Sequence, residues 1–136
     1  MNARLILAAR TLEDPAARRP VRWLFLGYSL VLIVLTLWPA LKVPEIVHRS
    51  DLVAHLSFFG AFTTLAIASG FFGPVFSRRN ISLAWIACAA FAGIDEGLQA
   101  IPALNRTCAW DDMAANTMGT LAAALLMALW GSLARD

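Results

Sequence analysis

The sequence predicts an all-α integral membrane protein, built as a bundle of four transmembrane helices. Of its 136 residues, 60% are hydrophobic and only 15% are charged, whereas an average soluble domain is about half apolar and about a quarter charged. Four segments each hold the roughly 20 apolar residues that a helix needs to cross a hydrocarbon core about 30 Å thick. The length suits a single domain.

The charge and cysteine content exclude several classes of function. Eleven Lys and Arg against nine Asp and Glu give a net charge of +2, too small an excess for a basic stripe that follows a nucleic-acid backbone. Two cysteines are too few for a disulfide framework, so we expect Cys88 and Cys108 to be free thiols. The glycines are scattered and the sequence has no CxxC or GKS/T motif, which gives no indication of a zinc or phosphate-loop site.

Residues 1–20 are predicted to form a basic cytoplasmic segment on the membrane surface, followed by a transmembrane domain over residues 21–136. The apolar stretch at residues 5–9 is too short for the core of a signal peptide. The first span is predicted over residues 23–41 as an uncleaved anchor, because Pro39 and Pro44 end the apolar run.

Three further spans follow, each bounded by residues that break or cap helices. They are predicted over residues 52–72, 81–101 and 113–133. Gly73 with Pro74 and then Pro102 mark the ends of the second and third spans. The predicted N-caps of the second, third and fourth spans are Ser50, Asn80 and Asp111.

Basic residues are divided unevenly between the two sides of this topology. One side carries eight arginines, namely Arg4, Arg10, Arg18, Arg19, Arg22, Arg78, Arg79 and Arg135, and the other carries Lys42, Arg49 and Arg106. Basic residues are retained on the cytoplasmic face. We therefore expect both termini in the cytoplasm and the loops at residues 42–50 and 102–110 outside.

Polar side chains gather at the outer end of three spans. They are Asp51 and His55 in the second span, Asp95, Glu96 and Gln99 in the third, and Asp112 and Asn116 in the fourth. At 1.5 Å per residue, His55 and Asn116 are expected roughly 6 Å inside their helix starts and Glu96 roughly 7 to 8 Å from its helix end. The small-residue pairs Gly93/Gly97, Ala115/Gly119 and Ala66/Gly70 predict close helix packing. The sequence therefore predicts a polar pocket, with the loop around Arg106 as its lid.

Each polar residue has a functional and a structural interpretation. The catalytic candidates are His55, Glu96 and Asp112, and the ligand-binding candidates are Asp51, Asp95, Gln99, Arg106 and Asn116. His55 suits a general base or a metal ligand, or it is simply held by a hydrogen bond that it donates to Asp51. Glu96 has no inexpensive structural reason to lie inside a span, whereas Asp95 is expected to reach the membrane interface. Arg106 suits a phosphate or carboxylate ligand, or an internal ion pair with Glu96 or Asp112.

These residues resemble the pattern of the VanZ-like family of small bacterial membrane proteins. Asp51 and His55 match its opening and Asp95, Glu96 and Gln99 its Asp-Glu-x-x-Gln motif, while Arg106, Trp110, Asp112, Asn116 and Gly119 match its close. The match covers residues 51–124. Leu52 replaces the family's Lys, Ala123 replaces a frequent second Gly, and AIPALN precedes Arg106 where the family often has Pro-Gly.

The resemblance implies a cell-envelope role in the bacterial inner membrane, since the family's namesake is associated with teicoplanin resistance. We expect a pocket that binds or modifies an anionic lipid-linked or wall-related ligand. If the protein is an enzyme, we expect a hydrolase or transferase that acts on the headgroup. The acids of the cluster could also hold a divalent metal ion. A homodimer, with a second copy of the chain as partner, is a further expectation. The alternative is a noncatalytic protein whose polar cluster only fastens the helices together.

Overall fold

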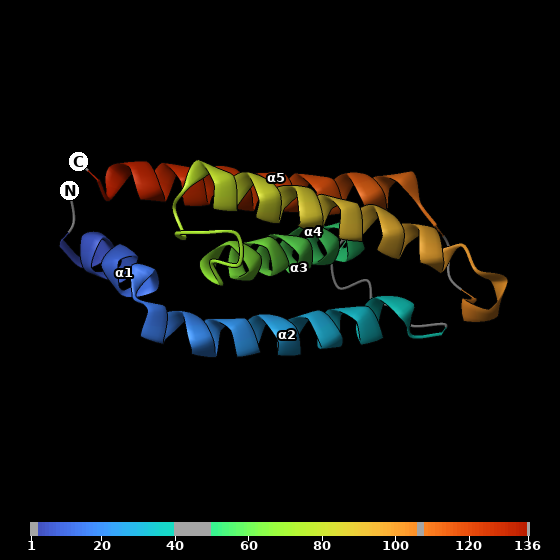
Figure 1. Cartoon of the computed structure of the whole chain (residues 1–136). Helices are drawn as coiled ribbons and strands as arrows, with labels where there is room; N and C mark the ends of the chain where they lie inside the picture. Colours follow the sequence, from blue (N-terminus) through green and yellow to red (C-terminus); the bar gives the residue numbers. More distant parts are fainter. Residues whose placement is uncertain (1–2, 40–49, 106–107, 136) are drawn as a thin grey trace.

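The computed structural model describes residues 3–39, 50–105 and 108–135. Its elements are α1 Ala3–Glu13, α2 Pro15–Leu37, α3 Ser50–Ala68, α4 Arg78–Gln99, the short 3₁₀ helix η1 Pro102–Leu104, and α5 Trp110–Leu133 (Figure 1). Within those ranges no residue belongs to a β-strand, which confirms the all-α prediction.

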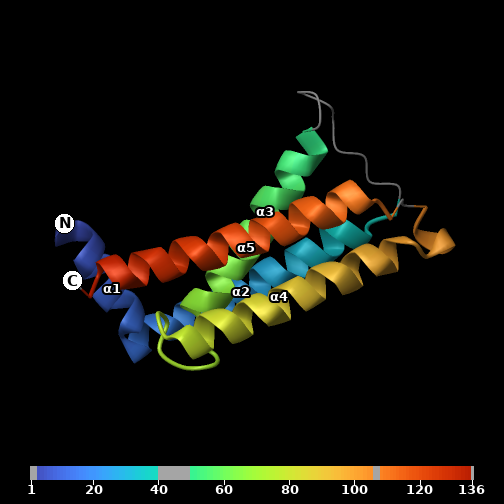
Figure 2. The ribbon, with the colours of Figure 1, turned by 90° about the horizontal axis from the view of Figure 1, so that it is seen from above.

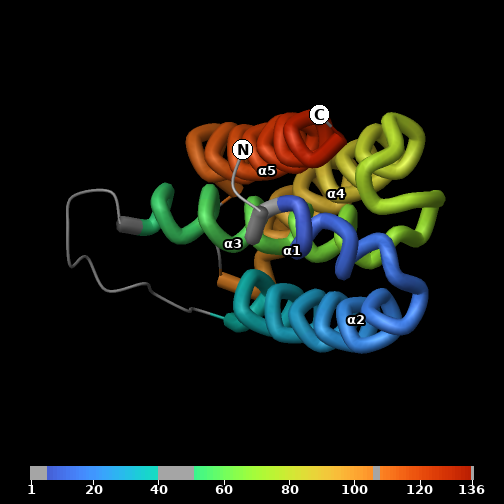
Figure 3. Tube along the Cα trace, turned by 90° about the vertical axis from the view of Figure 1, so that its left-hand side faces the viewer, coloured from blue at the N-terminus to red at the C-terminus, as the bar shows by residue number. Residues whose placement is uncertain are grey.

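The four long helices α2, α3, α4 and α5 run alternately up and down the bundle (Figure 1). Both termini, α1 and the α3–α4 connection lie at one end, which we call the terminal end. The α4–α5 connection lies at the other, which we call the polar end. Viewed along the bundle, α3 lies among the other three helices (Figure 3), and its largest interface is with α5.

All four long helices are long and apolar enough to cross a membrane, which confirms the prediction of four spans. The bounds differ at the first span, where α2 begins at Pro15 and passes through residue 20. Proline at the first helical position is favourable, because its missing N–H would be unsatisfied there anyway, and the Asp14 carboxylate accepts from Ala16 N. The helix ends at Leu37, two residues before Pro39.

The predicted end of the second span was wrong. Helix α3 ends at Ala68, four residues before the predicted end at residue 72. Gly70 adopts a φ of +57°, the left-handed conformation that ends many helices, and its N–H donates to Ile67 O at 3.0 Å. Ala66/Gly70 is therefore not a helix-packing pair, because Gly70 lies in the turn.

Two predicted N-caps were also wrong. The cap of α4 is Ser77, whose hydroxyl accepts from Asn80 N. Asn80 is instead fully buried, and its side-chain amide donates to Ile67 O and Val75 O at 2.9 Å while accepting from Phe72 N at 3.1 Å. The capping position of α5 is Ala109 and makes no side-chain bond. Asp111 lies in the first turn of that helix.

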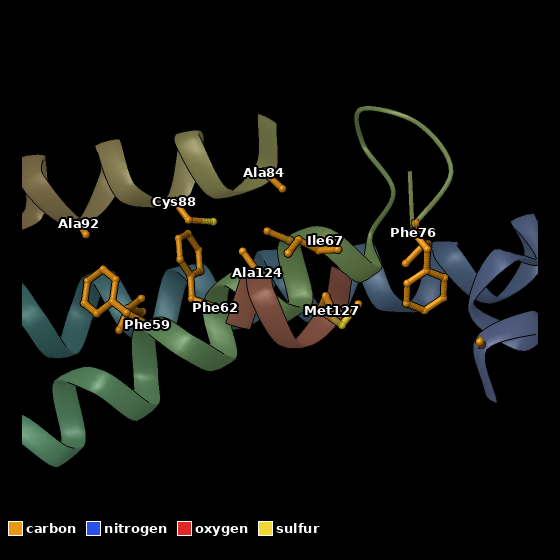
Figure 4. Close-up of a cluster of buried hydrophobic side chains, with 13 residues drawn as sticks. Phe59, Phe62, Ile67, Phe76, Ala84, Cys88, Ala92, Ala124 and Met127 are labelled. Carbon is orange, nitrogen blue, oxygen red and sulfur yellow. The ribbon is translucent and has the colours of Figure 1, made fainter. Parts of the chain in front are cut away.

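The core is a cluster of apolar side chains between α3, α4 and α5 (Figure 4). Phe62 lies near its centre, with ring centroids 5.1 Å from Phe91 and 5.2 Å from Phe25 of α2. Cys88 is buried in this cluster and Cys108 is exposed; both are free, as expected. Many large apolar side chains instead point outward, including Leu30 at 64% exposure and Leu126 at 66%. Such a surface suits a lipid environment.

Helices α3 and α5 approach most closely at Gly119. A Cβ added there would collide with Leu56 O and come within 3.1 Å of Gly60 N. This confirms close packing at the Ala115/Gly119 pair, and Ala115 is buried as well. The prediction for Gly93 and Gly97 was wrong, since a Cβ at either position would meet nothing within 4 Å.

Two basic residues and one acid fasten the terminal end. The Glu13 carboxylate pairs with Arg18 at 2.9 Å and accepts from Val75 N and Phe76 N at 3.1 Å each. The Arg22 guanidinium donates to Ser69 O at 2.9 Å and Gly70 O at 3.3 Å, which neutralises the carbonyl end of α3. The sequence analysis did not predict these contacts.

Candidate functional site: a polar cluster at one end of the bundle

Polar side chains from the start of α3, the end of α4 and the start of α5 meet at the polar end. Asp95, Glu96, Gln99 and Asn116 are each no more than 2% exposed, although each belongs to a helix that is otherwise mostly apolar. Burying such groups in a membrane-spanning bundle costs free energy unless they have partners. The partners of each residue therefore indicate its role.

The His55 ring joins α3 to α5. Its Nδ1 lies 3.0 Å from Asn116 Oδ1, and its Nε2 lies 3.7 Å from Asp112 Oδ2. An amide oxygen only accepts, so Nδ1 carries the proton in this pair, and a neutral ring then has its lone pair on Nε2. Because 3.7 Å is beyond hydrogen-bond distance, a direct Nε2–Asp112 hydrogen bond does not form. Nε2 is thus placed to accept a proton or a hydrogen bond from a bound group.

Glu96 faces the start of α5. Its Oε1 accepts from Ala109 N at 2.8 Å, and its Oε2 is buried with no hydrogen-bond partner in the described part of the chain. His55 and Asp112 lie within electrostatic range of this carboxylate. The predicted depth was wrong, because α4 ends at Gln99 and Glu96 lies in its last turn. The carboxylate is nevertheless fully buried, with the Ala109 N–H directly before α5 against it.

The sequence analysis expected the Asp95 side chain to reach the membrane interface, and this expectation was wrong. It is 2% exposed, and its Oδ1 accepts from Thr36 Oγ1 of α2 at 2.6 Å. Gln99 Nε2 lies 3.4 Å from Asp95 Oδ2, one helical turn away. Asp95 thus faces α2 while Glu96 faces α5, since neighbouring helical residues point about 100° apart.

The remaining candidates are placed differently. Asp51 is exposed at the start of α3, and both nitrogens of the His55 ring face α5. The structural interpretation in which Asp51 holds His55 was therefore wrong. Arg106, predicted to bind a ligand from the lid, lies outside the described residues.

An apolar groove of about 350 Å³ lies between α3 and α5 at the same end. Leu52, Leu56, Ala115 and Met118 line it, with Asp111 the one charged residue among its described lining. Leu56 follows His55 in the chain, and Asp111 and Ala115 directly precede Asp112 and Asn116. The groove and the polar cluster therefore occupy adjacent faces of the same two helices.

Comparison with protein families decides the identity. The family model described as VanZ/LLP1 matches residues 25–131, which is most of the chain. The chain belongs to the VanZ/LLP1 family. With its four apolar helices, this VanZ/LLP1 protein is a multi-pass membrane protein. No curated protein and no solved structure matches the chain.

Within the described ranges, no group of three His, Cys, Asp or Glu side chains is arranged to hold a metal ion.

Sequence reasoning missed two contacts of the site, namely Thr36, the partner of Asp95, and the Ala109 N–H that binds Glu96. A threonine in the last turn of an apolar span was the available signal for the first, but a backbone N–H gives none.

Proposed function

We propose that this VanZ/LLP1 protein binds the polar headgroup of a lipid-linked or wall-related molecule at its polar cluster. The observation that carries the proposal is a pair of buried, unpartnered atoms. In the described part of the chain, Glu96 Oε2 and Asn116 Nδ2 make no hydrogen bond. Buried polar atoms normally have partners, so an acceptor and a donor left open in one cluster suit a ligand that supplies both.

The α3–α5 groove supports a ligand with a hydrocarbon part. Its lining is apolar at Leu52, Leu56 and Met118, and it lies beside the face that carries His55 and Asn116. A molecule with its chain in the groove and its headgroup at the cluster would satisfy both surfaces. This combination favours a lipid-linked molecule over a soluble one.

The charge distribution supports an extracytoplasmic site. Eight arginines belong to the terminal end in the sequence, and basic residues are retained in the cytoplasm. On this basis we propose that both termini are cytoplasmic and that the polar cluster faces outward. That the membrane is the bacterial inner membrane is proposed from the family. We include an anionic headgroup in the proposal because the Arg106 side chain suits a phosphate or a carboxylate. We include an envelope role of the teicoplanin-resistance type because membership of the family suggests it.

Catalysis on the bound headgroup would use His55. With Nδ1 bonded to Asn116 and Asp112 at 3.7 Å from Nε2, the ring is oriented to remove a proton from water or from a headgroup hydroxyl. Asp112 would stabilise the protonated ring. The reaction class is hydrolysis or group transfer at the headgroup.

The alternative function, a purely structural cluster, is favoured by a specific observation. Thr36–Asp95 joins α2 to α4, and His55–Asn116 joins α3 to α5. Together with the bond from Ala109 N to Glu96, which joins the start of α5 to α4, these bonds connect all four helices. The two functions give different outcomes when the unpartnered atoms are changed.

Glu96→Gln is the first test of the proposed function. A glutamine keeps the size of the side chain and an acceptor for Ala109 N but removes the charge and replaces one carboxylate oxygen with a donor. We expect at least about a fivefold loss of co-purifying membrane lipid, measured by native mass spectrometry, because a mismatched buried hydrogen bond costs about 1 to 3 kcal/mol. The folded yield should match that of the wild type.

The matched control is Thr117→Ala, which changes the exposed neighbour of Asn116 on the outer face of α5. A loss of folded yield in Glu96→Gln, with lipid retention per folded molecule unchanged, would identify the cluster as structural. The resistance role is tested separately, by the teicoplanin concentration that inhibits cells expressing the wild type or Glu96→Gln. Equal inhibition of expressing and non-expressing cells would exclude that role.

A further inference from the structure

A second pocket lies at the terminal end, far from the polar cluster. It has a volume of about 350 Å³ and is formed by α1, the α3–α4 connection and the last turns of α5. These elements meet at one end of the bundle in Figure 2. Phe76 and Ala134 contribute apolar surface, while Arg10 and Arg135 contribute charge from opposite ends of the chain. Its size suits a small headgroup.

The two arginines are available to bind an anion. Both are exposed, and neither forms an ion pair with another described residue. The acid in the pocket lining, Glu13, is already engaged by Arg18, Val75 N and Phe76 N. The pocket therefore presents two guanidinium groups that pair with no other described residue, beside a neutralised carboxylate.

The surroundings of the pocket are also positively charged. In the sequence, the terminal end carries eight arginines against three acids, Glu13, Asp14 and Asp136. The Asp14 carboxylate is used to cap α2. Arg78 and Arg79 directly follow Ser77 of the pocket lining. The electrostatic potential at this end therefore favours an anionic ligand.

The apolar surface beside the pocket indicates that the anion belongs to a lipid. Ala9, Pro74, Phe76 and Ala134 give the pocket a mostly apolar lining, and Leu7, one turn before Arg10 on α1, is 67% exposed. An acyl chain lying on this apolar surface would place a phosphate beside the two arginines. Guanidinium groups bind phosphate oxygens through paired, charge-assisted hydrogen bonds.

We infer that the terminal end holds an anionic phospholipid, with its phosphate between Arg10 and Arg135 and its glycerol in the pocket. This site is separate from the proposed headgroup site at the polar end and does not depend on it. It places a structural lipid where α1 and the end of α5 meet. The bound lipid joins the first and last helices of the chain.

The test compares the full-length protein with the double variant Arg10→Gln/Arg135→Gln. The protein in neutral detergent is titrated with phosphatidylglycerol, and bound lipid is counted by native mass spectrometry. Each guanidinium that hydrogen-bonds the phosphate contributes at least about fivefold to the affinity, so the double variant should bind about 30-fold more weakly or worse. Both side chains are exposed, and the variant should elute as a folded protein of unchanged size.

The matched control is Arg19→Gln/Arg79→Gln. It removes the same charge from the same end, and both residues are exposed outside the pocket lining. Its affinity should fall no more than about fivefold, since these two arginines do not contact the phosphate and their long-range attraction is screened by salt. An equal loss in both double variants would overturn the site.

Two further arms identify the ligand. Phosphatidylcholine, with no net charge, should bind at least tenfold more weakly than phosphatidylglycerol, and equal binding would overturn the proposal. Inorganic phosphate should not displace the lipid at concentrations up to a hundred times that of the lipid. Displacement would show a free-anion site. Filling the pocket with Ala134→Phe should weaken lipid binding while every arginine remains.

Discussion

At the scale of single residues, the structure assigns different roles to two buried asparagines. Asn80 and Asn116 are both fully buried in helices. The amide of Asn80 has three backbone partners, whereas Asn116 has His55 and one open donor. Asn80 is therefore a structural residue, and Asn116 is a candidate for ligand binding.

Asn80→Ala is expected to destabilise the protein by about 3 kcal/mol, because it leaves Ile67 O, Val75 O and Phe72 N without their partner in the interior. The measurement is the free energy of unfolding in a detergent titration. Ser82→Ala, at an exposed position on the same helix, should change it by less than about 0.5 kcal/mol. If the two variants unfold alike, the bonds of Asn80 contribute nothing to stability.

At the scale of helices, the contact of α3 with α5 shows how a small-residue pair acts. Gly119 lies against the α3 backbone at Leu56 and Gly60, while Gly93 and Gly97 of α4 face open space. The motif is the same in both helices. Only the direction in which it faces differs.

Gly119→Ala is expected to lower stability by about 3 kcal/mol, because the added methyl group forces α3 and α5 apart. Gly97→Ala is the control and should be neutral or raise stability by up to about 1 kcal/mol, since alanine is the better helix former. The thermal unfolding midpoints in detergent provide the comparison. A greater loss for Gly97→Ala would contradict the helix packing described above.

Much of the helix order was predictable from hydropathy, but the helix ends and neighbours were not. Four apolar runs fixed the number of spans, and Pro39 indicated the end of the first. Gly93/Gly97 misled because a small-residue spacing does not show which helix it faces. The α3 end was misplaced because Gly70 ends the helix before the more conspicuous Gly73 and Pro74.

The candidate site was predictable in composition and not in its contacts. Charged groups in a span must gather where they find partners, which indicated His55, Glu96 and Asn116 together. That Asp95 pairs with Thr36 of α2, and Asp51 stays exposed, depends on helix rotation. The sequence does not determine that rotation without the packing.

At the scale of the whole molecule, the arginines of the terminal end and the polar cluster lie at opposite ends of the bundle. Cys108 is exposed in the α4–α5 connection, and Cys88 is 2% exposed in the core. Cys108 therefore provides a native thiol that can be labelled to show on which side of the membrane the polar end lies. Thr11 of α1 is exposed at the other end and bonds only to its own helix.

A membrane-impermeant maleimide applied to intact cells should label the native chain at Cys108, because the polar end is proposed to face outward. The second protein combines Cys108→Ala with Thr11→Cys and should be labelled only after the cells are permeabilised. Labelling is read as a mass shift on a gel. The reverse pattern would place the polar cluster in the cytoplasm and refute the proposed orientation.

The contacts of Glu13 have a consequence for how the chain is made. Its backbone partners Val75 and Phe76 follow it by 62 and 63 residues, so at ordinary synthesis rates Glu13 is synthesised roughly 3 to 12 s before them. During that interval Arg18, five residues away, is the one of these three partners already synthesised. Helix α1 therefore docks late onto the α3–α4 connection, and the pocket at Arg10 is completed only after Arg135 has been synthesised.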